Sequence, residues 1–349
     1  MRVDNLQAQF DTTLAPHLKN NTDTIGLAVS GGGDSIALLR MAGRSSLISN
    51  DRVYVFTVDH GLRPESADEA LFVCEQCEVL GISHRTLLWS QPNPSQARAR
   101  SARHKLLANA VREQGGTLLV TGHTLSDNVE SFLMRARASS GWYGLSGMGA
   151  VSASPVWPDG QGVFIARPML GMHRKAIREW LQDQGIGWRD DPTNENMAYE
   201  RVRMRRLLSD APQMSARISS VQRKLSLLRK SRDTQIANWL STAEARNDEL
   251  HLQMPGDMSA EALAQSLSLA CMAVASTDTP TRANRSLAAA QKLKTASSLT
   301  FTLGGTVVRC RLGTIEISRE KNRPDLSNTA NFMHRLQHIC AGLTGRSSA

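Results

Sequence analysis

Long apolar runs are missing from this chain of 349 residues. No stretch approaches the roughly 20 apolar residues that a membrane-spanning helix needs, so we expect no membrane span. The opening residues, "MRVDNLQAQFDTTL", include acidic side chains and lack an apolar centre, so we do not expect a secretory signal. The length allows two or three domains with sizeable cores, and we expect the protein to act in the cytoplasm.

Cysteine is scarce as well, and the five cysteines are scattered: Cys74, Cys77, Cys271, Cys310 and Cys340. An odd, scattered set argues against a disulfide framework. Cys74 and Cys77 form one C-x-x-C inside "ADEALFVCEQCEVLGI", an amphipathic pattern that predicts a helix. A structural zinc site needs two more ligands at a workable spacing, and no second pair exists. We therefore interpret both cysteines as helix residues rather than as a metal or redox site.

Acidic side chains are too few to balance the basic ones, and the formal net charge is +9. A basic balance favours a polyanionic partner, most simply a nucleic acid, although charge alone fits a merely basic soluble protein equally well. The arginines are clustered: "ARARSARHK" (97–105) and "ERVRMRRLL" (200–208) each carry four cations. These clusters predict salt-dependent contacts with phosphates.

Short apolar runs alternate with helical patterns in the first half of the chain. The strand-like runs cover residues 25–29, 52–61, 84–89, 117–123 and 163–169. Helical patterns follow over residues 36–42, 67–82, 95–114, from about 125, and 173–185. This alternation predicts an α/β fold with a Rossmann-like parallel sheet, built by right-handed crossovers and covered on both faces. Ligands of such sheets bind outside the carboxyl ends of the strands.

The composition changes beyond Arg206. Residues 210–300 are rich in Ala, Leu, Ser and Arg and are predicted to be helical, with a break at "PGDMS" (255–259). Residues 299–320, "LTFTLGGTVVRCRLGTIEISRE", predict a short β-meander with glycine turns. The tail from residue 321 is polar and weakly patterned. We predict three domains: residues 1–208, a helical linker over 209–254, and a small α+β C-terminal domain over 255–349.

The stretch "SGGGDS" (30–35) lies between a predicted strand and a predicted helix. Glycines there let backbone N–H groups approach a phosphate, and the helix N-terminus adds partial positive charge. The alternative is a tight turn that binds nothing. The loop lacks the lysine of nucleoside triphosphatase loops, and Asp34 stands in that region instead. An aspartate can hold a Mg²⁺ that bridges phosphates, so the loop fits release of pyrophosphate better than γ-phosphoryl transfer.

The loop resembles the pyrophosphate-binding loop of the N-type ATP pyrophosphatases, the PP-loop family. Within that group, further motifs in the same order resemble the tRNA(Ile)-lysidine synthetase family: "VDHGLR" (58–63), "ARSAR" (99–103), "GHTLSDNVES" (122–131), "ARPML" (166–170) and "DDPTNEN" with "YERVRMR" (190–205). The resemblance covers about the first 208 residues, and the C-terminal "TLGGTVV" resembles the ends of bacterial members weakly.

The resemblance implies a two-step ligation with ATP and Mg²⁺ as cofactors. ATP adenylates the C2 oxygen of the wobble cytidine in a tRNA(Ile) with a CAU anticodon, and pyrophosphate leaves. The ε-amino group of free L-lysine then attacks C2, AMP leaves, and lysidine forms. A carboxylate near the amine is needed, since the lysine must lose its proton. The basic helices at 217–232 and the C-terminal domain are candidates for binding the acceptor stem and elbow of the tRNA, and the resemblance suggests a homodimer.

The resemblance carries over several residues to the nucleotide and the metal. Asp34 would hold Mg²⁺ and take part in catalysis. The residues that would bind ATP are Ser30, Gly31, Gly32, Gly33, Asp34, Ser35, Asp59, His60, Arg63, Arg100, Arg103 and His123. For Arg100 and Arg103, which share one helix face, a solvated basic helix is the alternative.

Asp127 and Glu130 match the family's second aspartate and its glutamate. Their spacing places them on one helix face, and we expect them to act in catalysis on the lysine and the activated cytidine. The other substrate-binding candidates are Asp191, Asn194, Arg201, Arg203 and Arg205. The three arginines do not share one helix face, so we expect an extended entry to a helix.

The chain departs from the family pattern in this region. Ser126 stands where the family has its first aspartate and Ser131 where it has a threonine; "ASSG" (138–141) replaces R-G-S-G. If the missing arginine contacts phosphate, Arg135 or Arg137 must compensate. These departures keep open a catalytically silent RNA-binding relative, and Cys74 with Cys77 keeps open a PP-loop tRNA thiolase.

Overall fold

The computed structural model describes residues 3–18, 23–59, 65–89, 95–190, 196–320 and 332–345. The chain forms two compact units, one of residues 1–154 and 163–229, the other of residues 155–162 and 230–349. The change from one unit to the other falls inside helix α9 (Pro212–Leu240). The boundaries at 208 and 254 concern functional domains and stay predictions.

The first unit is built on a six-stranded sheet in the order β3-β2-β1-β4-β6-β5. Its strands are β1 (Ile25–Ala28), β2 (Val53–Asp59), β3 (Ser83–Leu88), β4 (Leu118–Thr121), β5 (Val151–Ala153) and β6 (Phe164–Ala166). All neighbouring pairs are parallel except β5 and β6. The five predicted strands are confirmed. The strand order changes direction between β1 and β4, which places a crevice outside their carboxyl ends.

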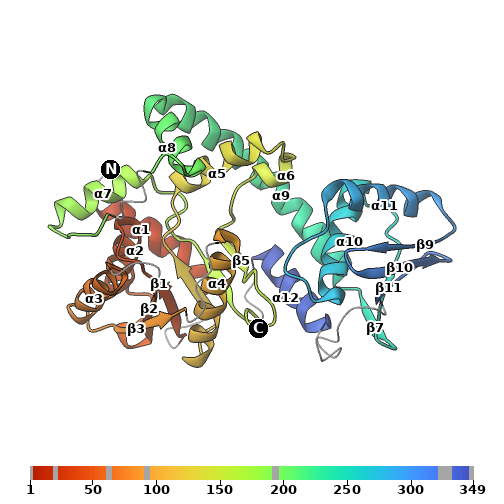
Figure 1. Ribbon diagram of the computed structural model, residues 1–349, viewed down its shortest axis with the longest axis horizontal. Coiled ribbons are helices and arrows are strands. Elements are labelled where there is room, and N and C mark those ends of the chain that lie inside the picture. The colour runs from red at the N-terminus through yellow and green to blue at the C-terminus, as the bar shows by residue number, and fades with distance from the viewer. Residues whose placement is uncertain are drawn as a thin grey trace. The chain divides into compact units, whose positions relative to one another are not determined.

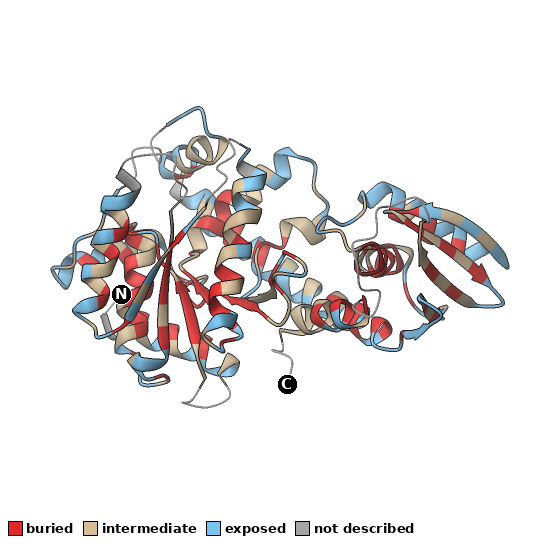
Figure 2. Cartoon of the chain, turned by 60° about the horizontal axis from the view of Figure 1, so that its bottom comes forward, coloured by how far each residue is buried: buried red, intermediate tan, exposed pale blue. Residues whose placement is uncertain are grey.

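Helices cover the sheet of the first unit (Figure 1). They are α1 (Val3–Leu14), α2 (Gly33–Arg44), α3 (Glu65–Glu78), α4 (Gln96–Glu113), α5 (Leu125–Arg137), α6 (Trp142–Leu145), α7 (Arg174–Asp183) and α8 (Glu200–Asp210), with 3-10 turns η1 (Ala15–His17) and η2 (Asn50–Arg52). Leu107 and Val111 of α4 pack in one cluster with Phe56, Leu119 and Ile165 of the strands. Figure 2 shows the buried strands with helices on both sides.

The second unit has an antiparallel sheet in the order β7-β8-β11-β10-β9. Its elements are β7 (Glu244–Arg246), β8 (Glu249–Gln253), α10 (Ala260–Ala275), α11 (Ala283–Thr295), β9 (Ser298–Leu303), β10 (Thr306–Arg311), β11 (Thr314–Arg319) and α12 (Phe332–Thr344). Its core joins Leu263 and Leu267 of α10 to Val308 and Ile315 of the sheet. The predicted meander over residues 299–320 is confirmed as β9, β10 and β11.

Three expectations from the pattern are wrong. Residues 244–253, predicted to be helical, form β7 and β8. Strands of three and five residues are too short to show a periodicity of their own within a longer segment of helical composition. The weakly patterned tail contains α12, which buries Phe332 and Leu336 in the core of the second unit. Residues 200–205, predicted as an extended entry, begin the helix α8. In the described part of the chain, no helix combines the length and apolar character needed to cross a membrane.

Candidate active site

The glycine loop connects β1 to α2 at the carboxyl edge of the sheet. Gly31 has a φ of +87°, a backbone conformation that glycine adopts without strain. The Ser35 hydroxyl donates to the Gly32 carbonyl at 2.8 Å and accepts from the Ser30 N–H at 3.1 Å. Gly32 is the N-cap of α2 and supplies no side-chain cap. The positive end of α2 is thus left for an anion, as the sequence predicts.

Two neighbouring segments approach this loop closely. The end of β4 comes so near that a Cβ on Gly122 would lie 2.9 Å from the Asp34 carbonyl oxygen, so the position requires glycine. On another side, the Arg189 N–H donates to the Gly31 carbonyl at 3.0 Å, and Trp188 lies against Gly33. Sequence reasoning missed this segment because its link to the loop is a backbone hydrogen bond between residues far apart in the sequence.

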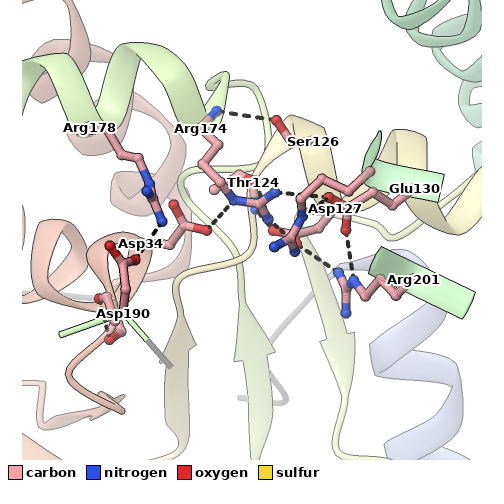
Figure 3. Close-up of polar contacts among 12 residues, drawn as sticks. Asp34, Thr124, Ser126, Asp127, Glu130, Arg174, Arg178, Asp190 and Arg201 are labelled. Carbon is pink, nitrogen blue, oxygen red and sulfur yellow. Dashed lines mark hydrogen bonds and ion pairs between the residues drawn. The ribbon is translucent and has the colours of Figure 1, made fainter. Parts of the chain in front are cut away.

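Three carboxylates meet one guanidinium beside the loop (Figure 3). Arg174, the first residue of α7, donates from Nε to Asp34 at 2.8 Å, from Nη1 to Glu130 at 2.8 Å and from Nη2 to Asp127 at 2.6 Å. The structure thus brings together the three residues that the sequence proposes for catalysis. It joins them through Arg174, which sequence reasoning missed. The available signal was a cation in the first turn of a helix, where the helix dipole disfavours it.

Helix α8 supplies two more arginines to the same carboxylates. Arg201 donates to Glu130 and to Asp127, each at 2.7 Å, and Arg205 donates to Glu130 at 3.0 Å. Arg201 and Arg205 are one helical turn apart, which explains why both reach one target. Arg203 lies on another side of α8 and donates instead to the carbonyls of Met197 and Ala198, so it does not join the cluster.

The positions of Asp127 and Glu130 follow from the start of α5. Asp127 accepts hydrogen bonds from the N–H and the hydroxyl of Thr124 at 2.7 and 2.8 Å, which forms a capping box. Glu130 lies one turn later and is 1% exposed. Ser126, which replaces the family's first aspartate, accepts from the backbone N–H of Arg174 at 3.2 Å and so ties α5 to α7.

Burial and the arginines act in opposite directions on these carboxylates. Burial alone would raise the pKa of Asp127 and Glu130, but other groups outweigh it and lower both pKa values. For Asp127 these are Arg174, Arg201 and the hydrogen bonds from Thr124, and for Glu130 they are Arg174, Arg205 and Arg201. For Asp34, burial dominates over Arg174, and its pKa is raised. Asp127 and Glu130 are therefore ionised at neutral pH and form ion pairs with the arginines of α7 and α8.

Residues at the end of β4 and on α4 interact electrostatically with the carboxylate cluster and its arginines. His123 shares a hydrogen bond of 2.8 Å with the Thr121 hydroxyl, and burial followed by Arg167 lowers its pKa to about 4. His123 is therefore neutral at physiological pH. Burial, with Arg100 and Arg201 nearby, also lowers the pKa of Arg103.

Asp34 suits a metal ion bound together with phosphates. Its Oδ2 accepts from Arg174, whereas its Oδ1 is buried and accepts no hydrogen bond from any described residue. A buried carboxylate oxygen without a donor fits one direct bond to Mg²⁺, with phosphates and water as the other ligands. The described residues contain no group of three or more His, Cys, Asp or Glu that could hold a metal by themselves.

The remaining predicted residues divide by position. Asp59 lies at the end of β2, and its carbonyl accepts the Trp89 N–H at 2.9 Å. His60 and Arg63, expected at ATP, and Asp191 and Asn194, expected at substrate, lie outside the described residues.

Comparison with known proteins identifies the family. Residues 3–211 match the PP-loop domain family. A tRNA(Ile)-lysidine synthase of Hyphomonas neptunium is 45% identical over 271 residues, which cover 76% of this chain and 74% of the relative. A tRNA(Ile)-lysidine synthase of Ruegeria pomeroyi is 36% identical over 251 residues, or 70% of this chain and 56% of that protein.

Among solved structures, the U34-tRNA thiolase NcsA from Methanococcus maripaludis superposes with a TM-score of 0.51. It is 16% identical and covers 64% of this chain and 78% of its own, so this likeness concerns the fold alone. By the sequence matches, the chain belongs to the PP-loop domain family and, within it, to the ligases named tRNA(Ile)-lysidine synthases.

Proposed function

We propose that this protein ligates free L-lysine to C2 of the wobble cytidine in a tRNA(Ile) with a CAU anticodon. The reaction runs through an adenylated tRNA and releases pyrophosphate and then AMP. The observation that carries the proposal is the pair of ionised carboxylates, Asp127 and Glu130. The guanidinium that binds both of them also binds Asp34 at the glycine loop. This arrangement supports a site for a cationic amine beside a site for phosphates.

The first step uses the loop and the start of α2. The ATP phosphates would bind the backbone N–H groups after Gly31 and the Ser30 hydroxyl, where the helix dipole favours negative charge. The Asp34 Oδ1 would hold Mg²⁺, whose charge would stabilise pyrophosphate as the leaving group. The C2 oxygen of cytidine would attack the α-phosphate, which turns a poor leaving group into AMP.

The second step needs room for the lysine ammonium group at Asp127 and Glu130. Glu130 accepts from Arg174 and Arg205 through Oε1 and from Arg201 through Oε2. An incoming ammonium group would therefore displace at least one guanidinium of α8 from these oxygens. The displaced guanidinium would become available to a phosphate of the nucleotide or the RNA. Binding of lysine and binding of the phosphorylated substrate would thus favour one another.

The decisive assay is incorporation of labelled lysine into a transcript of tRNA(Ile) with a CAU anticodon. We expect incorporation that depends on ATP and releases AMP, and no incorporation into elongator tRNA(Met). Asp127→Asn should keep ATP binding and lose lysine incorporation, because the amide cannot attract the ammonium group. Normal incorporation by Asp127→Asn, or release of ADP in place of AMP, would contradict the proposal.

A further inference from the structure

A glycine-rich segment of the first unit, Gly141–Ala150 with the sequence "GWYGLSGMGA", is used neither by the glycine loop nor by the carboxylate cluster. It contains α6 and lies beside α5 and α9 (Figure 1). Asn128 of α5 fastens it: the Met148 N–H donates to Asn128 Oδ1 at 2.8 Å, and Asn128 Nδ2 donates back to the Met148 carbonyl at 3.4 Å. Since Asn128 follows Asp127 directly, the segment is anchored next to the reaction centre.

The anchoring also determines one residue type in the segment. Gly147 has a φ of +83°, and a Cβ there would lie 2.9 Å from both Asn128 Oδ1 and Gln222 Nε2. A side chain at this position would therefore push the segment away from α5 and α9. The close approach indicates a fixed position rather than a loose surface loop.

Three guanidinium groups from different parts of the chain bind carbonyls of this segment. Arg135 of α5 donates to the Gly144 carbonyl, Arg229 of α9 donates to the Gly147 carbonyl at 3.0 Å, and Arg167, just after β6, donates to the Gly149 carbonyl at 3.0 Å. A carbonyl orients a guanidinium and leaves its charge in place. Of the three, Arg135 is exposed and has no carboxylate within ion-pair distance in the described ranges, whereas Arg167 is buried. An anion can therefore neutralise the charge of Arg135 at the surface of the segment.

Two aromatic side chains stand next to these cations. The rings of Trp142 and Tyr143 pack edge to face, with centroids 5.7 Å apart, and the guanidinium of Arg229 lies 4.6 Å from the centre of the Tyr143 ring. Both aromatic residues are half-buried and keep part of their surface exposed. Aromatic rings close to an exposed guanidinium, here that of Arg135, are the elements with which proteins bind unpaired nucleotides, through base stacking and phosphate contacts.

We propose that Gly141–Ala150 is a platform for unpaired nucleotides that flank the reacting base of the substrate RNA. Trp142 stacks on a base, and Arg135 binds a backbone phosphate. This inference rests on the proposed function for the presence of an RNA loop. An enzyme that reacts at a base atom must take that base out of its stack, which deprives the neighbouring bases of a partner. An aromatic ring on the segment that Asn128, the residue after Asp127, holds in place replaces that partner.

The test measures binding of the protein to the isolated anticodon stem-loop RNA by fluorescence anisotropy. We expect Trp142→Ala to bind about tenfold more weakly and Trp142→Phe to bind nearly as well as the unchanged protein, because phenylalanine keeps a face for stacking. Trp142→Leu, which keeps apolar volume without a π-face, should also bind about tenfold more weakly. If Trp142→Ala unfolds at a lower temperature than the unchanged protein, Trp142→Leu replaces it in the comparison with Trp142→Phe.

The charge component has its own readout. Arg135→Gln should reduce the slope of log binding constant against log salt by about one, which corresponds to one lost phosphate contact. Arg112→Gln, at the far end of α4, is the matched control, since Arg112 is exposed and contacts Asn109. Its salt slope should not change.

Equal affinities of Trp142→Leu and Trp142→Phe would overturn the stacking role, as would equal competition by a fully paired RNA with the same number of phosphates. An unchanged slope for Arg135→Gln would overturn the phosphate role. Lysine incorporation by the unchanged protein is measured separately. Its absence would refute the proposed function, whereas these stem-loop affinities would still decide whether the platform binds unpaired nucleotides.

Discussion

At the scale of single residues, Arg174 decides whether the site can exist. Asp34, Asp127 and Glu130 would repel one another, and each of the three nitrogens of one guanidinium binds one of them. Arg201 and Arg205 add contacts only to Asp127 and Glu130. The carboxylates were predictable because their spacing along a helix is local information. Arg174 lies 44 residues beyond Glu130, and its role depends on the packing of α7 against α2 and on the hydrogen bond from the Arg174 N–H to Ser126.

We expect Arg174→Gln to lower the free energy of unfolding by about 3–5 kcal/mol at pH 7, because it removes the arginine paired with Asp34 and one of the arginines paired with Asp127 and Glu130. Asp127 and Glu130 have lowered pKa values, so in the unchanged protein their stabilisation is complete above about pH 4.5 and is lost as the pH falls through their folded pKa values. In Arg174→Gln the free energy of unfolding should therefore fall less between pH 7 and pH 4 than it does in the unchanged protein. Urea unfolding at pH 7 and at pH 4 measures both effects.

The matched control is Lys175→Gln, on the next residue of α7. Lys175 is 89% exposed and lies 3.9 Å from Glu179, so its loss should change stability by less than about 0.5 kcal/mol. A similar small change for Arg174→Gln would show that the carboxylates do not depend on that guanidinium.

At the scale of elements, predictability follows burial. The strands β1, β2 and β4 read as apolar runs because both faces are covered. β5 has three half-buried residues and β7 three exposed ones, so neither leaves a periodic pattern. In α8 the alternating arginines imitate the period of a strand, whereas the contacts of Arg201 and Arg205 with Glu130 belong to a helix. These tertiary contacts, which a single sequence does not show, distinguish the helix from the predicted extended segment.

Helix α8 also separates two roles for its arginines. Arg201 and Arg205 bind carboxylates of the site, while Arg206 is exposed. We expect Arg206→Gln to weaken tRNA binding modestly and to reduce its salt slope by about one, since an exposed arginine is free to bind a phosphate. Filter binding of full-length tRNA between low and high salt measures the slope. Arg246→Gln is the control, because Arg246 pairs with Glu244. Equal salt slopes for Arg206→Gln and the unchanged protein would show that Arg206 of α8 does not contact an RNA phosphate.

At the scale of the whole molecule, charge and chemistry are distributed unequally between the two units. The first unit holds the glycine loop, the carboxylates and the arginines that bind them. The second unit has its own core, in which Leu250, Leu263 and Ile315 are fully buried. In the first unit, Cys77 is buried in α3, and burial raises the pKa of its thiol to about 12. A thiol in that state is a poor sulfur carrier or cluster ligand, so the structure gives the thiolase alternative no support from this residue.

Because each unit has a separate core, we expect ATP with Mg²⁺ to stabilise them unequally. A ligand at about one hundred times its dissociation constant stabilises the part that binds it by about 2.7 kcal/mol. Differential scanning calorimetry should therefore show two transitions, of which only that of residues 1–154 and 163–229 rises in temperature with ATP. Ser30→Ala should reduce this rise, since it removes a hydroxyl from the phosphate site without changing charge. A single transition whose temperature rises with ATP would show that the two units unfold together. Transition temperatures that do not change with ATP would contradict ATP binding at the glycine loop.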